Sequence, residues 1–174
     1  MVRPATGRQW GGAAIVGCRT AAGWGILGPM TLNLGDGRIV VGTARTERAD
    51  AIDLVRGWLD AMARRDFGAA APMMVTGARI VISGGHEFGT LEDFAAFSAG
   101  RYTTLRKQPD AFETCEAPGG IAVYVRGTAS GAFVDGQEFM GARWVDRFQV
   151  TQGRIAGLET WSDLAELRLA RGAS

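Results

Sequence analysis

Four consecutive β-type segments fill most of the chain between Phe112 and Trp161. They lie at residues 112–116, 121–133, 139–150 and 154–161, and β-branched and aromatic side chains are frequent in them. The turns between them are rich in glycine and include an Asp-Gly pair at 135–136, a strong hairpin signal because both residues accept a positive φ. Consecutive strands joined by short turns predict an antiparallel meander.

Helical patterns precede these strands. Between residues 52 and 62, apolar side chains recur at spacings of three, four and three residues, which is one face of a helix that Thr46 can cap. A short helical piece at 66–73, a strand at 79–82 and a helix opened by the capping box at 90–93 follow, and leucines after Ser162 indicate a last helix. This order predicts an α+β fold with its helices gathered on one face of a curved sheet.

The start of the chain differs in composition from the remainder. Residues 1–44 hold 10 of the 26 glycines and four of the 19 basic residues, but one of the 18 acidic residues. We therefore expect residues 1–45 to be a basic, glycine-rich extension, poorly ordered or arising from a start site assigned too far upstream. One domain at 46–170 and a tail at 171–174 are expected to follow.

Charge and cysteine content limit the partners. The net charge of +1 argues against nucleic acid or an anionic membrane surface as the main partner, and no apolar run approaches the roughly 20 residues of a membrane span. Two separated cysteines fit a reducing, cytoplasmic setting. Because the sequence has no phosphate-binding glycine loop and no metal-spaced His or Cys cluster, we expect no nucleotide cofactor and no metal site.

Two motifs resemble a known superfamily. The segments DRFQVTQGRI (146–155) and ETWSDLAE (159–166), together with the long first helix leading to DFGA (66–69), are similar to the nuclear transport factor 2-like, or SnoaL-like, proteins. The resemblance covers about residues 46–168 and includes ketosteroid isomerase, scytalone dehydratase, limonene epoxide hydrolase and SnoaL-type polyketide cyclases. It implies an α-α-β-α-β-β-β-β cone whose antiparallel sheet encloses a pocket, and a homodimer formed through the outward sheet face.

Alternation along the late strands indicates which side chains enter that pocket. Trp144, Asp146 and Phe148 share the more apolar face of their strand, which we expect to point inward. The same argument assigns Glu159 and Trp161 of the last strand to the inside. An aspartate among aromatic side chains can serve as a general acid or base. The alternative is that Asp146 is a structural group paired with an arginine, such as Arg101 or Arg126.

The remaining candidates lie outside these strands. The resemblance to SnoaL-type cyclases, which use an Asp and a His, makes His86 the expected catalytic partner of Asp146, with Glu159 in support; the alternative is a loop histidine without a role. Tyr102 and Trp58 are expected in the pocket wall, beside Trp144, Phe148 and Trp161. Residues 80–83 carry no carboxylate where ketosteroid isomerase has its base, so the same isomerisation is not expected.

Two functions follow from these expectations. The first is a cofactor-free acid–base enzyme, of isomerase, cyclase or dehydratase/hydratase type, acting on a small hydrophobic or polyketide-like molecule. The second is a non-catalytic member of the same fold that binds a ligand or a partner protein. They differ in whether the catalytic candidates open onto a single cavity.

Overall fold

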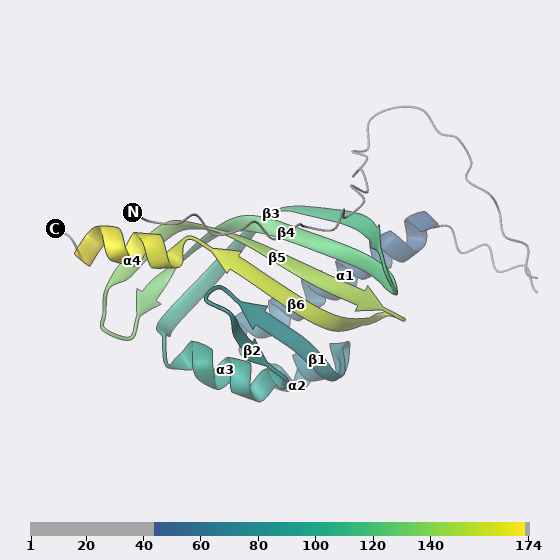
Figure 1. The fold of residues 1–174 in the computed structure, drawn as a ribbon, viewed down its shortest axis with the longest axis horizontal. Coiled ribbons are helices and arrows are strands. Elements are labelled where there is room, and N and C mark those ends of the chain that lie inside the picture. The colour runs from purple at the N-terminus through teal and green to yellow at the C-terminus, as the bar shows by residue number, and fades with distance from the viewer. Residues whose placement is uncertain (1–43, 173–174) are drawn as a thin grey trace, which may run out of the picture. The chain divides into compact units, whose positions relative to one another are not determined.

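The computed structural model describes residues 44–172. Most of the predicted extension at 1–45 and the last two residues of the predicted tail lie outside this range. In chain order, the elements are α1 (Ala44–Ala63), α2 (Phe67–Ala70), the 3-10 turn η1 (Ala71–Met73), β1 (Met74–Ile82), β2 (His86–Phe88), α3 (Leu91–Ala99), β3 (Tyr102–Ala117), β4 (Gly120–Phe133), β5 (Glu138–Thr151), β6 (Arg154–Ser162) and α4 (Leu164–Gly172) (Figure 1). The expected helices and the four late strands are present.

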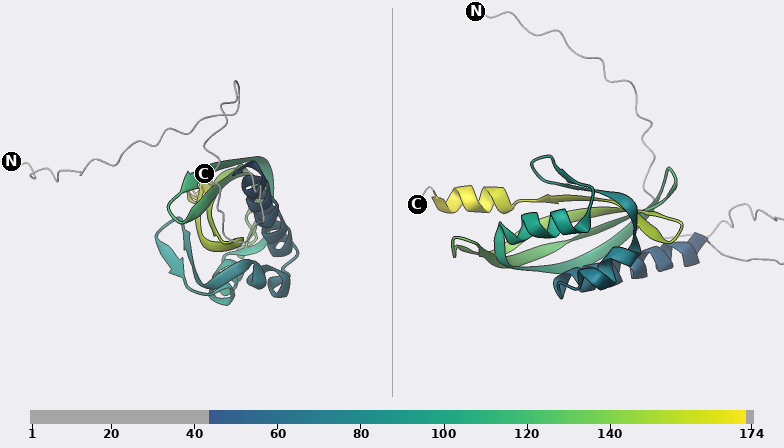
Figure 2. Two further views of the ribbon diagram at one scale, coloured as in Figure 1. Left: turned by 90° about the vertical axis from the view of Figure 1, so that its right-hand side faces the viewer. Right: turned by 90° about the horizontal axis from the view of Figure 1, so that it is seen from below.

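The strands form one six-stranded sheet in the order β2-β1-β6-β5-β4-β3. β3 to β6 pair antiparallel as the predicted meander, but β1 pairs parallel with β6, so the sheet is mixed and not purely antiparallel as expected. The sheet curls, and α1 lies across its concave side (Figure 2). The α+β cone fold is therefore confirmed, with a parallel pair and one additional short strand.

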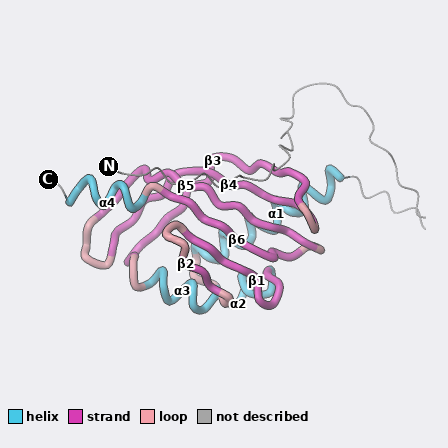
Figure 3. Tube along the Cα trace, in the orientation of Figure 1, coloured by secondary structure: helices cyan, strands magenta, loops and turns pink. Residues whose placement is uncertain are grey.

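Two strands begin earlier than predicted, and one short strand was not predicted (Figure 3). β1 begins at Met74, five residues before the predicted start at 79. β3 begins at Tyr102, ten residues before the predicted start, because Pro109 does not interrupt it. β3 is an edge strand, where the missing amide of a proline is tolerated, and its pairing with β4 shifts between Pro109 and Ala111. β2 has three residues, paired with β1 from Ile82↔His86 to Ile80↔Phe88.

Two glycines of β4 allow the sheet to bend sharply toward β3. A Cβ added at Gly127 would lie 2.0 Å from the carbonyl oxygen of Gln108, and one at Gly131 would lie 2.1 Å from that of Thr104. No other residue fits so close to a backbone carbonyl. These two glycines therefore allow the backbones of β3 and β4 to approach closely.

The core lies between α1 and the concave side of the sheet. Ala51, Val55 and Trp58 are buried on α1, and the Trp58 ring meets Phe148 of β5 edge-on at 5.4 Å between centroids. Along β5, Trp144, Asp146 and Phe148 are all buried, which confirms the predicted inward face of this strand. Asp146 is the one charged residue among the described residues whose side chain is fully enclosed.

Candidate functional site

A cavity of about 280 Å³ opens where α3 and the start of β3 face the ends of β5 and β6. Its walls are largely apolar and aromatic, with Phe94, Phe97, Leu105 and Trp144 among them. The polar side chains that line it are Ser83, His86, Ser98, Arg101, Tyr102, Lys107, Thr160 and Ser162. An apolar cavity with a few convergent polar groups is the usual form of a small-molecule site.

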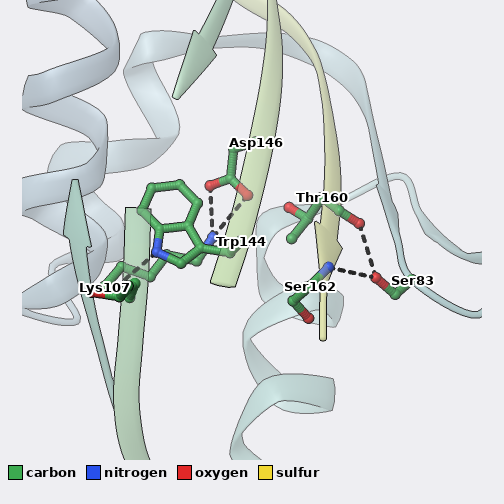
Figure 4. Close-up of polar contacts among 7 residues, drawn as sticks. Ser83, Lys107, Trp144, Asp146, Thr160 and Ser162 are labelled. Atoms are coloured by element: carbon green, nitrogen blue, oxygen red, sulfur yellow. Dashed lines mark hydrogen bonds and ion pairs between the residues drawn. The ribbon is translucent and has the colours of Figure 1, made fainter. Parts of the chain in front are cut away.

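A buried ion pair forms the floor of this cavity. The Lys107 ammonium donates to both carboxylate oxygens of Asp146, at 2.8 and 2.6 Å, and lies 4.3 Å from the centre of a Trp144 ring (Figure 4). Trp144 is itself held by its indole N–H, which donates to the Thr128 carbonyl at 2.9 Å. The Asp146 side chain is 0% exposed and the Lys107 side chain 26%, so the lysine faces the cavity and the aspartate lies behind it.

The partner of Asp146 is thus a lysine, not either of the arginines considered as alternatives. Arg126 lies 3.7 Å from Glu113 in an exposed pair, and Arg101 lies over the rings of Phe97 and Tyr102, at 5.2 and 5.7 Å. Lys107 is the single lysine of the chain, beside 18 arginines. Sequence reasoning missed it because the strand that carries it was expected to begin at residue 112.

His86 lines the same cavity as Lys107. It belongs to β2, is exposed, and packs its ring against Phe97 at 4.8 Å between centroids. The expected pairing of Asp146 with His86 is not found, because Asp146 binds Lys107 instead. Of the three predicted catalytic residues, His86 lines the cavity, whereas Asp146 and Glu159 do not.

Glu159 and Trp161 lie on the outer face of the sheet, so their predicted inward orientation is wrong. Glu159 lies 3.8 Å from the outward-facing Arg147, and Trp161 is 50% exposed opposite Val145. The cause is a bulge in β6. Ile155 pairs with Val150 but Gly157 pairs with Gln149, so Ala156 is an extra residue that reverses the alternation beyond it.

Thr160 and Ser162 take the inward positions instead. They lie opposite Asp146 and Trp144 in the register and line the cavity. Ser83, from the end of β1, joins them: its hydroxyl donates to the Thr160 carbonyl at 3.3 Å and accepts the Ser162 amide at 3.2 Å (Figure 4). Such side-chain bonds to backbone fix this rim of the cavity.

Four of the five expected wall residues are divided between the cavity and the core. Tyr102 lines the cavity as predicted, together with Trp144. Trp58 and Phe148 are buried in the core and are not among the lining residues. The Trp58 indole N–H has no hydrogen-bond partner among the described residues.

Tyr102 is the cavity residue whose ionisation the fold changes. Burial raises the pKa of its phenol above the ordinary value of 10.0, and the charges of Arg101 and Arg168 oppose this only in part. The phenol therefore remains a hydrogen-bond donor at any physiological pH.

The raised pKa of Tyr102 can be tested by titration at alkaline pH. A group with a raised pKa in the folded state stabilises the fold below its unfolded pKa, and that contribution is lost as the pH rises from about 10 through the folded value. In a Tyr124→Phe variant, which leaves Tyr102 as the one tyrosine, we expect tyrosinate absorbance to appear at higher pH in the folded protein than in the urea-unfolded protein. Coincident titrations in the two states would contradict the burial.

Neither a metal site nor a membrane-spanning helix is found in the described part of the chain. Within residues 44–172, no three His, Cys, Asp or Glu side chains come together in a way that could hold a metal ion. No helix in the same range combines the length and the apolar character needed to cross a membrane.

The sequence matches no protein-family model and no curated protein, whereas the fold matches many solved structures. An NTF2-like protein of unknown function from Burkholderia pseudomallei superposes with a TM-score of 0.58 at 21% identity, over 68% of this chain and 94% of its own. An LEH-like epoxide hydrolase from M. tuberculosis matches with a TM-score of 0.56 at 18% identity, over 72% and 92%. A SnoaL-like polyketide cyclase from a Jannaschia species matches with a TM-score of 0.56 at 18% identity, over 70% and 91%.

Sequence identities this low do not show that two proteins share an activity. The superpositions nevertheless cover more than nine-tenths of each of these known structures. This chain therefore shares the fold of these NTF2-like and SnoaL-like structures.

Proposed function

We propose that the protein binds a small hydrophobic carbonyl compound in this cavity and acts on it by acid–base chemistry that needs no metal or nucleotide. The observation that carries the proposal is that His86 and Lys107, the ammonium of which is paired with the enclosed Asp146, line one apolar-walled cavity. An imidazole can take and return a proton near neutral pH, and an ammonium can stabilise an oxygen on which negative charge develops.

The reaction class follows from these two groups. His86 takes a proton from the carbon beside the substrate carbonyl, and the electron pair of the broken C–H bond moves to the carbonyl oxygen as an enolate. Lys107 donates a hydrogen bond to that oxygen. Return of the proton at another carbon gives isomerisation, loss of a neighbouring hydroxyl as water gives dehydration, and attack of the enolate on a second carbonyl gives cyclisation.

Asp146 has a positioning role in this scheme. Its carboxylate is enclosed and both of its oxygens bind Lys107, so it acts by holding the ammonium in place and not by touching the substrate. The low exposure of Asp146 and Lys107 strengthens the attraction between their charges. The position of the ammonium over the Trp144 ring further restricts the lysine side chain. Glu159 has no part in the proposed site, because it lies on the other face of the sheet.

Exchange of substrate protons for deuterium tests the proposal directly. Bicyclic ketones such as 1-tetralone, incubated with the protein in D₂O, should exchange the protons beside the carbonyl faster than with a heat-inactivated sample. Binding without exchange across a panel of ketones and lactones would favour the second function, a non-catalytic ligand-binding protein. That reading is supported by the exposure of His86 and by the absence of any carboxylate among the described cavity-lining residues.

The proposal also includes a cytoplasmic homodimer. Its support is the outer face of the sheet, where Trp161 (50% exposed) and Val145 (37% exposed) are opposite each other in the register of β5 and β6. Exposed large apolar side chains that are adjacent on one face are typical of interfaces.

A further inference from the structure

We infer that the ligand of this cavity is an aromatic acid, whose anionic oxygens bind Arg101 while its reacting carbonyl faces Lys107. The inference rests on the proposed function, because it names the class of molecule that the same cavity accepts. Three features of the described residues support it: the charge of the cavity lining, the placement of Arg101, and the nature of the walls.

The lining carries positive charge that its own residues do not balance. Arg101 and Lys107 line the cavity, and no aspartate or glutamate does so within residues 44–172. The enclosed Asp146 carboxylate balances the charge of Lys107. For Arg101, no ion pair is found among the described residues. The walls are apolar and weakly polarisable, so one uncompensated cation raises the local affinity for an anion.

The backbone of Arg101 is anchored, and its guanidinium is held against aromatic rings. Its amide donates to the Ser98 carbonyl and its carbonyl accepts the Val134 amide, each at 3.1 Å. The guanidinium lies 5.2 Å from the Phe97 ring centre and 5.7 Å from that of Tyr102. A guanidinium placed beside the cavity can bind a planar oxyanion through two parallel hydrogen bonds.

The two cations enter the cavity from separate places. Arg101 precedes β3, at the turn after α3, whereas Lys107 lies inside the strand and is already bound to Asp146. Phe94, Phe97 and Trp144 supply flat walls, which favour a flat ligand. The cavity therefore fits a molecule that has an aromatic body, a carbonyl group at one position and an acid group at another.

Matched pairs of probes that differ only in charge test this inference. We would titrate the full chain with 2-naphthoate and with 2-naphthamide and follow binding by calorimetry. The native protein should bind the acid at least about tenfold more tightly than the amide, since a charge-assisted hydrogen bond is stronger than a neutral one. The preference should shrink as salt is added.

Variants assign the preference to one residue. Arg101→Gln should bind both probes with similar affinity, and Arg101→Lys should keep part of the preference. Arg106→Gln is the matched control: Arg106 is exposed on β3, five residues after Arg101, and does not line the cavity, so its replacement should leave the preference unchanged.

The outcomes separate the inference from the function on which it rests. Equal binding of acid and amide by the native protein, or a preference that survives Arg101→Gln, overturns the inference and leaves the proposed function in place. If 2-naphthoate, 2-naphthamide and 1-tetralone all fail to bind, both the inference and the proposed function are wrong. If Arg101→Gln does not fold, Arg101→Lys keeps the test: a preference equal to that of the native protein would overturn the assignment to the Arg101 guanidinium.

Discussion

Replacing Lys107 by methionine lowers the free energy of unfolding by about 3–5 kcal/mol, the cost expected when one partner of a buried ion pair is removed. Asp146 is then left with its carboxylate enclosed at 0% exposure and without the ammonium that binds both of its oxygens. The 26% exposure of Lys107 admits some water and places the expected loss toward the lower end. Urea unfolding of the variant and the native protein measures it.

The double variant distinguishes a lost ion pair from lost packing. Adding Asp146→Leu to Lys107→Met should recover most of the stability, because two apolar side chains replace two charges. As a matched control, Arg79→Met breaks the bidentate pair with Glu87, whose side chains are 57% and 53% exposed, and should change stability little. A Lys107→Met protein as stable as the native one would show that the pair is not enclosed as described.

Replacing His86 by glutamine slows the exchange of ketone protons by about 100-fold or more, the usual contribution of a positioned general base. Glutamine keeps hydrogen-bonding capacity but cannot take the proton. Because His86 is exposed at the cavity mouth, the substitution should leave the unfolding curve nearly unchanged, so a loss of rate reports on chemistry.

A neighbouring variant provides the control for His86. Glu87 follows it on β2, is exposed, and does not line the cavity, so Glu87→Gln should exchange protons at the native rate. If His86→Gln and Glu87→Gln both retain the native rate, His86 is not the base, and the proposed mechanism is wrong in its first step.

Much of the fold could be predicted because most of its helices and strands follow patterns in the nearby sequence. The glycine-containing turns delimit β4, β5 and β6 nearly where the structure has them, and the alternation of Trp144, Asp146 and Phe148 identified the enclosed face of β5. The helix cap at Thr90 is also as expected, since the Asp93 amide donates to its hydroxyl at 3.1 Å. What these signals share is that each depends on residues close together in sequence.

The site was less predictable because it depends on departures from regular pattern. The extra residue at Ala156 reverses which side chains of β6 face inward, so that Thr160 takes the inward position expected for Glu159. No feature of the composition marks a bulge there. Lys107 lies in the first part of β3, which was not predicted because Pro109 follows it. A proline within a segment argues against a strand, unless that strand lies at the edge of a sheet, as β3 does. Edge position and register are properties of the assembled sheet, so they could not be read from one segment.

The proposed function requires that His86 and Lys107 contact one bound molecule, and the chain supplies its own reporters for this contact. It contains one histidine and one lysine, so the imidazole and ammonium-group signals of each can be assigned in an NMR spectrum without further variants. Titration with 1-tetralone or 2-naphthoate should shift both signals with the same dissociation constant. A ligand that moves one signal while the other stays in place, or moves the two with different constants, would contradict a shared site.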